Sequence, residues 1–132
     1  MTRTYLMIKP EAVRAGLYPD ILRSLLANRF SIERIEMKLV TPDEARRFYA
    51  EHEGKAFFGE LVNYITSGPV VAVQVAGDNA QPRLRELVGK TNPKDASPGT
   101  LRYMYGTSLQ ENAVHASDGP EAAERELGII FG

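Results

Sequence analysis

Cysteine is absent from this sequence of 132 residues, and histidine occurs only twice. The lack of cysteine excludes disulfides, zinc–thiolate sites and thiol nucleophiles together, and it fits a reducing compartment. Any histidine chemistry therefore has to use His52 or His115.

An excess of charge of one sign is also lacking. Sixteen Lys and Arg residues face 17 Asp and Glu residues, which gives a formal net charge of -1. This excludes a global basic field for nucleic acid but allows a local cationic cleft. The apolar run near the N-terminus, residues 5–8, is too short for a signal peptide core, and no later run is long enough to cross a bilayer. We expect a cytoplasmic protein that needs neither nucleic acid nor a membrane as a partner.

The common nucleotide-binding and catalytic motifs are missing as well. Residues 54–59 have the glycine spacing of a P-loop, but Glu60 follows where that motif requires lysine. No G-x-G-x-x-G, H-E-x-x-H or G-x-S-x-G stretch occurs. A nucleotide site in this chain would have to do without a P-loop or a Rossmann turn.

The length and a composition of 43% apolar and 25% charged residues suit one globular domain, residues 1–132. Short apolar or alternating runs predict strands at residues 4–8, 35–39, 70–75 and 112–116. Helical periodicity and capping signals predict helices at 19–28, 41–50, 57–65, 79–88 and 118–128, and residues 92–100 are expected to form an ordered loop. Residues 35–39 are expected to be half-buried, and Asp118 is expected to cap the last helix.

This order reduces to βαββαβ, which is typical of an α/β (α+β) sandwich with an antiparallel sheet covered by helices. Such a fold does not identify a function, so the function has to come from particular residues.

His115 is the stronger candidate for chemistry. It lies between a predicted strand and a helix, and its small neighbours Ala116 and Ser117 leave the imidazole room. A neutral imidazole near pH 7 is a competent nucleophile without an activating base. The alternative is a structural histidine whose ring is hydrogen-bonded at a strand end. His52 lies between Glu51 and Glu53, which favours a solvated surface histidine.

Residues 112–118, Asn-Ala-Val-His-Ala-Ser-Asp, resemble the active-site signature of nucleoside diphosphate kinases. Five further stretches match that family in the same order, so the resemblance covers essentially the whole chain. They are residues 8–12 (Ile-Lys-Pro-Glu-Ala), 57–58 (Phe-Phe), 67–71 (Ser-Gly-Pro-Val-Val), 91–93 (Thr-Asn-Pro) and 98–102 (Pro-Gly-Thr-Leu-Arg).

The resemblance implies a ferredoxin-like fold and a ping-pong transfer of the γ-phosphate of a nucleoside triphosphate, mainly ATP, to a nucleoside diphosphate. His115 would carry the phosphoryl group as phosphohistidine. Lys9, Arg85 and Arg102 match the family's phosphate-contacting cations, and Thr91 matches its hydroxyl donor to phosphate. Mg²⁺ is the implied cofactor, held mainly by the nucleotide phosphates rather than by protein ligands.

The resemblance implies roles for five further residues. Tyr49 matches a tyrosine near the transferred phosphate, and Asn112 matches the residue that contacts the sugar hydroxyl. Glu126 matches a carboxylate that holds the imidazole, with Ser117 beside it. Phe57 matches the aromatic residue that stacks on the base. Without the resemblance, Tyr49 could equally be a core residue and Glu126 a surface charge. The alternative for Phe57 is a core anchor on an amphipathic helix, a role that suits Phe58 better.

The chain departs from the family after Arg102, where Tyr103-Met104-Tyr105 replaces the usual Gly-Asp-Phe. Family members are homo-oligomers, so we expect a hexamer or a tetramer. Their long loop before the last strand corresponds to residues 92–110 here, and we expect its apolar side chains, Tyr103, Met104, Tyr105 and Leu109, at subunit contacts. Two other hypotheses stay open: a catalytically silent nucleotide-binding scaffold of this fold, and a histidine phosphocarrier that exchanges phosphate with a protein.

Overall fold

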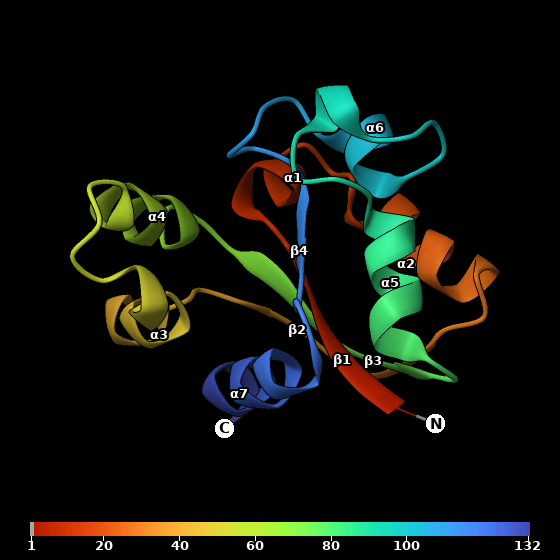
Figure 1. Ribbon diagram of the computed structural model, residues 1–132, viewed down its shortest axis with the longest axis horizontal. Coiled ribbons are helices and arrows are strands. Elements are labelled where there is room, and N and C mark those ends of the chain that lie inside the picture. The colour runs from red at the N-terminus through yellow and green to blue at the C-terminus, as the bar shows by residue number, and fades with distance from the viewer. Residues whose placement is uncertain (1) are drawn as a thin grey trace.

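Figure 1 presents the computed structural model, which describes residues 2–132. Four strands form one antiparallel sheet: β1 (Thr2–Ile8), β2 (Ser31–Lys38), β3 (Val70–Gly77) and β4 (Val114–Ala116). Their order across the sheet is β2-β3-β1-β4. The expected α+β sandwich is therefore confirmed, with β1 and β3 in the centre and β2 and β4 at the edges.

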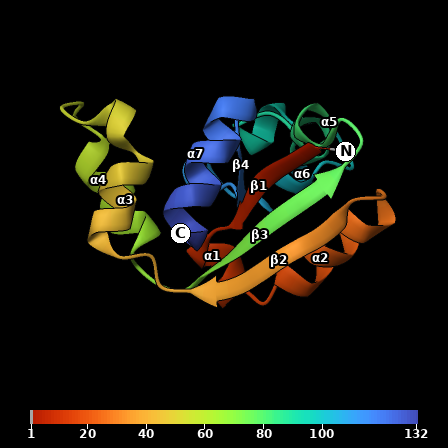
Figure 2. The same cartoon turned by 90° about the horizontal axis from the view of Figure 1, so that it is seen from below.

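Helices cover both faces of the sheet (Figures 1 and 2). One face carries α2 (Tyr18–Ala27) and α5 (Ala80–Val88), and the other carries α3 (Pro42–Phe48), α4 (Phe58–Ile65) and α7 (Pro120–Phe131). Short helices lie near one end of the sheet: α1 (Pro10–Arg14) and α6 (Leu101–Tyr105), with 3-10 turns at Ala50–His52 and Pro93–Asp95. Within residues 2–132, no helix has the length and apolarity needed to cross a membrane.

The alternation of side chains along β1 and β3 produces two separate apolar clusters. Leu6 and Ile8 of β1 pack towards α2 and α5, while Tyr5 and Met7 pack towards α3, α4 and α7. All four side chains are buried because both faces of these central strands are covered. The register pairs Met7 with His115, so the His115 side chain belongs to the α3–α4–α7 face.

The capping box predicted before the third helix is present. Thr41 Oγ1 accepts a hydrogen bond from the Glu44 amide at 3.1 Å, and the Glu44 carboxylate accepts one from the Thr41 amide at 3.0 Å. These bonds satisfy two amide groups that a helix N-terminus leaves unpaired. The helix ends at Phe48, and Tyr49 is its C-cap residue.

One helix, α1, was not predicted, and three local predictions were wrong. The chain continues from β1 directly into helix α1 at Pro10, since proline is well tolerated at a first helical position. Residues 101–105 form α6 rather than loop, with Thr100 as the N-cap. Gly119, not Asp118, occupies the N-cap of α7, and this helix continues to Phe131 instead of ending near residue 128.

The expectation of a half-buried second strand was also wrong. Ile35, Met37 and Leu39 are 51%, 52% and 63% exposed. β2 is an edge strand, and α2 covers only part of one of its faces. Leu26 of α2 is itself 58% exposed. The alternating pattern therefore marks an apolar surface of the single chain, which we call the β2 face (Leu26, Ile35, Met37 and Leu39).

Candidate active site

The predicted site residues converge on a cleft of about 500 Å³. Its lining residues come from the α3–α4 region on one side and from β4, α5 and α6 on the other. Figure 1 shows how these elements are arranged. Nine of the ten predicted residues line it, and the tenth, Ser117, lies behind the cleft wall against Glu126. The nine are Lys9, Tyr49, Phe57, Arg85, Thr91, Arg102, Asn112, His115 and Glu126.

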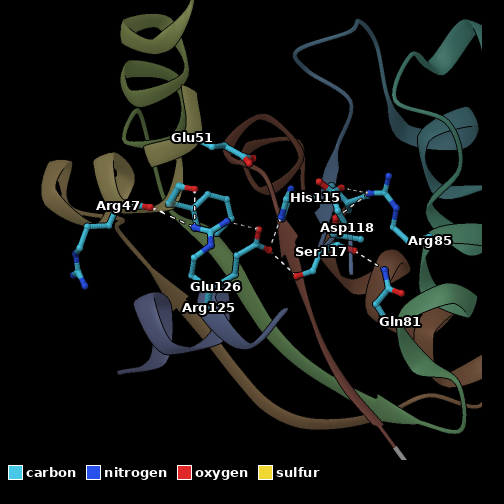
Figure 3. Close-up of polar contacts among 12 residues, drawn as sticks. Arg47, Glu51, Gln81, Arg85, His115, Ser117, Asp118, Arg125 and Glu126 are labelled. Atoms are coloured by element: carbon cyan, nitrogen blue, oxygen red, sulfur yellow. Dashed lines mark hydrogen bonds and ion pairs between the residues drawn. The ribbon is translucent and has the colours of Figure 1, made fainter. Parts of the chain in front are cut away.

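His115 is held by a buried carboxylate from helix α7 (Figure 3). Its Nε2 lies 2.8 Å from Glu126 Oε1, and the Ser117 hydroxyl donates to the same oxygen at 2.6 Å. The Phe48 ring packs edge-on against the imidazole, with centroids 5.1 Å apart. The imidazole is 22% exposed, whereas the Glu126 side chain is 6% exposed, so the histidine faces the cleft and the carboxylate lies behind it.

The charge of Glu126 decides which histidine nitrogen is available. Burial raises the pKa of Glu126, but hydrogen bonds from His115 and Ser117 outweigh burial and hold the pKa below its usual value. An ionised carboxylate only accepts, so His115 Nε2 carries the proton and donates it. In a neutral imidazole the lone pair is then on Nδ1, which is the nucleophilic atom of this arrangement.

Lys9 is a desolvated cation at the end of β1. Its Nζ donates to Asn112 Oδ1 at 2.7 Å and to the Gln110 carbonyl at 3.3 Å. Burial, together with the nearby charge of Arg102, lowers the pKa of Lys9 to about 8. Both hydrogen-bond acceptors are neutral, so neither neutralises the charge of the amine, although the charge of Glu11 partly offsets the effect of burial on the pKa.

Arg102 is 4% exposed, which is unusual for arginine. Its two terminal nitrogens donate to the Gly89 and Val114 carbonyls, both at 3.0 Å. Its Nε–H is buried and has no hydrogen-bond partner within residues 2–132. Burial and the charge of Arg85 lower the pKa of Arg102 to about 10, so the guanidinium remains charged at neutral pH.

Helix α5 supports the chain that follows His115 (Figure 3). Arg85 Nη1 donates to the Ala116 carbonyl at 2.9 Å and lies 3.4 Å from Asp118 Oδ1. Gln81, one turn earlier, donates to the Ser117 carbonyl at 3.0 Å. Asp118 thus approaches a cation of the cleft instead of capping a helix.

The remaining predicted residues lie around the cleft. Asn112 is buried and also donates to the Thr91 carbonyl at 2.9 Å, which links the two residues. Tyr49 packs edge-on against Phe48, with ring centroids 5.2 Å apart. Burial and the charge of Glu126 raise the pKa of Tyr49 to about 12, so its hydroxyl stays protonated and can donate. Phe57, at the start of α4, is 44% exposed.

Two further residues of the cleft had been assigned elsewhere from the sequence. His52 lines it, with its ring 5.3 Å from that of Phe57, so the expectation of a solvated surface histidine was wrong. Leu109, expected at a subunit contact, also lines the cleft although it is 61% exposed. The position of His52 depends on the turn after α3, and no local sequence signal marks either residue.

Sequence comparison with known proteins identifies one family. A family model described as nucleoside diphosphate kinase matches residues 2–132. A nucleoside diphosphate kinase of Deinococcus radiodurans is 46% identical over all 132 residues and 96% of its own length. One from Sulfolobus acidocaldarius is 46% identical over 99% of this chain and 90% of its own length.

Solved structures agree with the sequence comparison. The nucleoside diphosphate kinase of Aquifex aeolicus superposes with a TM-score of 0.95 at 39% identity, over 98% of this chain and 94% of its own. A halophilic nucleoside diphosphate kinase from Halobacterium salinarum, solved in complex with CDP, also gives 0.95, at 40% identity, over 98% of this chain and 87% of its own.

Proposed function

The chain belongs to the nucleoside diphosphate kinase family, and we propose that it transfers the γ-phosphate of a nucleoside triphosphate, mainly ATP, to a nucleoside diphosphate through phosphohistidine at His115. The membership confirms the resemblance found in the motifs. One observation carries the proposed mechanism: a carboxylate holds Nε2 of His115, which leaves Nδ1 as the nucleophile in a cleft that also contains three cations.

In the first half-reaction, the lone pair of Nδ1 forms a bond to the γ-phosphorus. The bond from phosphorus to the bridging oxygen breaks, and the nucleoside diphosphate leaves with that electron pair. No proton has to leave Nδ1 because the proton of the ring is on Nε2. The Glu126 carboxylate accepts the Nε2–H bond throughout and stabilises the positive charge that the ring gains. The second half-reaction reverses these steps with another nucleoside diphosphate.

The cations provide the electrostatic part of catalysis. A phosphoryl group in transfer carries charge on its equatorial oxygens, and fixed donors directed at them lower the barrier. We assign this role to Lys9, Arg85 and Arg102, and we assign Thr91 and Tyr49 as hydroxyl donors. Asn112 is assigned to the sugar hydroxyl, and Ser117 supports Glu126 through its 2.6 Å bond.

Mg²⁺ is the divalent cofactor we propose. Residues 2–132 contain no group of three or more acidic or histidine side chains able to hold a metal ion by themselves. The donor set of the cleft, with three cations, fits the phosphates instead, so these residues would hold the metal through the nucleotide. When bound, Mg²⁺ neutralises phosphate charge and makes the diphosphate a better leaving group.

We predict low selectivity for the base. Phe57 is exposed at the cleft and offers a π-face, against which purines and pyrimidines can both stack. The Phe57→Ala variant should therefore lose about 1–3 kcal/mol of nucleotide affinity, by a similar amount for ribo- and deoxynucleotides. Titration calorimetry with ADP, GDP, CDP and the corresponding deoxynucleotides measures this loss. Strict preference for one base would show that a polar side chain reads the base.

The activity should also decline at alkaline pH. The pKa of Lys9 in the free protein lies near 8, and only the protonated amine attracts phosphate. As pH rises through this value, kcat/KM should fall, because that ratio reports ionisation of the free enzyme. The decline in kcat should begin at higher pH, because bound phosphate favours the charged amine. A kcat/KM that stays flat through the alkaline range would contradict this role.

The two rival functions are separated from the proposed one by a single assay. Transfer of phosphate from ATP to GDP, with and without Mg²⁺, should require the metal and yield GTP. A silent nucleotide-binding scaffold would give no GTP. A histidine phosphocarrier would accept phosphate from ATP or a protein but fail to pass it to GDP.

We further propose that the protein is a homo-oligomer, a hexamer or a tetramer. The β2 face leaves four large apolar side chains in water on a single chain, and Tyr103 and Met104 of α6 are 52% and 45% exposed. Exposed apolar surface of this extent is typical of subunit contacts. Light scattering should give a mass four or six times the 14.6 kDa of one chain. A mass near one chain would contradict the assembly.

A substitution identifies which surface takes part in that assembly. Replacing Tyr103 by serine should weaken the oligomer, because its side chain is 52% exposed on the single chain. Tyr105, which was also expected at a subunit contact, instead packs against the apolar core of its own chain. An unchanged mass and thermal stability would remove α6 from the interface and leave the β2 face.

We also propose that residues 1–132 act as one domain, because both apolar clusters lie on one sheet. We propose as well that the protein is cytoplasmic, where its nucleotide substrates are found.

A further inference from the structure

The backbone between Asn112 and His115 is strained. Ala113 has a φ of 77°, in the left-handed region that residues with a side chain rarely adopt. The Val114 amide donates to the Asn112 carbonyl at 3.0 Å, which closes a three-residue turn around Ala113. This combination is a γ-turn of the rare, strained type, and such strain persists only where the surroundings enforce it.

The end of β1 and the start of α1 enforce it here. The Ala113 amide donates to Glu11 Oε2 at 2.9 Å, and the Ala113 carbonyl accepts from the Lys9 amide at 2.9 Å. Lys9 also binds the Asn112 side chain. Ala113 is completely buried, so without Glu11 its amide would have no access to a water molecule that could replace the bond.

Glu11 makes this bond at a cost to stability. Its other oxygen, Oε1, is buried and has no hydrogen-bond partner within residues 2–132. An unpaired buried carboxylate oxygen destabilises the folded state, which favours a role other than stability. The turn that Glu11 holds separates two site residues, Asn112 and His115.

We propose that Glu11 is a positioning residue for phosphoryl transfer, which holds the strained turn at Ala113 and so fixes Asn112 and His115 in the cleft. The inference rests on the proposed function. If the bond to the Ala113 amide is lost, the turn relaxes towards negative φ and displaces both residues. A displacement of about 1 Å at a reacting group is enough to lower the rate on the order of 10²-fold.

Glu11→Met and Glu11→Gln form a matched pair for the test. Methionine is similar in length and has no strong acceptor, whereas glutamine retains an oxygen for the Ala113 amide. We expect Glu11→Met to lower kcat on the order of 10- to 100-fold with little change in KM. We expect Glu11→Gln to stay within about threefold, because the geometry rather than the charge is maintained. Equal losses in the two variants, or no loss in Glu11→Met, would overturn the inference.

Ala113→Gly provides the second arm. Glycine adopts positive φ without strain, so the turn needs less support from Glu11. When Glu11→Met is combined with Ala113→Gly, it should therefore cost clearly less in kcat than it does in the otherwise unsubstituted chain. An equal cost in both backgrounds would overturn the positioning role. Hydrogen exchange of the Ala113 amide gives a readout without catalysis: it should be faster in Glu11→Met, and unchanged exchange would overturn the inference.

The outcome is separable from that of the proposed function. If the unsubstituted chain fails to transfer phosphate from ATP to GDP, the proposed function is wrong. If the unsubstituted chain transfers phosphate and Glu11→Met does so equally well, only the role of Glu11 is wrong. Thermal denaturation of each variant establishes that the compared proteins are folded.

Discussion

Replacing His115 by alanine is expected to abolish steady-state phosphoryl transfer. The cleft contains one histidine whose ring is oriented by a buried carboxylate, and the sequence has no cysteine to replace it as a nucleophile. The variant should still bind nucleotide, since Phe57 and the cations are untouched. The measurement is a coupled assay of GTP formation from ATP and GDP, together with nucleotide binding by calorimetry.

His52→Ala is the matched control for this loss. His52 lines the same cleft but contacts Phe57 and lies 3.4 Å from the Lys55 amine, and no carboxylate from α7 holds its ring. The His52→Ala variant should still form the covalent phosphoenzyme. Normal turnover by His115→Ala, or loss of the phosphoenzyme in His52→Ala alone, would show that the nucleophile had been assigned to the wrong histidine.

Removal of a cleft cation should produce the second large effect. Arg85→Ala is expected to lower kcat by roughly 10²-fold or more, because a fixed charge contributes most where charge develops in the transition state. KM should change less than kcat. Loss of the bonds from Arg85 to Ala116 and Asp118 adds to the effect by loosening the segment after His115. Single substitutions of Lys9 or Arg102 should act in the same direction.

Arg83→Ala on the same helix is the control for the Arg85 variant. Arg83 lies over the Phe30 ring at 4.3 Å and donates to the Asn28 carbonyl, away from the cleft. Its removal should leave kcat unchanged, although it has the same effect on net charge. An Arg85→Ala effect confined to KM would indicate uniform binding of substrate and transition state instead of catalysis.

The sequence predicted the sheet and most of the helices because their signals are local. The capping box at Thr41, the apolar run of β3 and the amphipathic pattern of α5 each depend on neighbours in the chain. The burial of β2 could not be predicted in this way. Apolar and charged residues alternate along β2 in the same way whether a helix or water covers its apolar side. The position of β2 at the edge of the sheet follows only from the complete topology.

The site residues were found through motifs, and their partners came only from the fold. The sequence places Glu126 11 positions after His115, and only the packing of α7 against the sheet brings their side chains to 2.8 Å. Helix α6 was mistaken for loop because it is five residues long and preceded by proline and glycine. The strained turn at Ala113 has no sequence signal, because alanine does not favour positive φ.

The most direct test is to map the phosphate on the protein after incubation with γ-labelled ATP and no acceptor. We expect one acid-labile, base-stable phosphate on His115, bonded to Nδ1 because Nε2 is held by Glu126. Addition of GDP should remove the label from the protein and convert it quantitatively to GTP. A phosphate on another residue, or one on His115 that GDP does not discharge, would contradict transfer through this histidine.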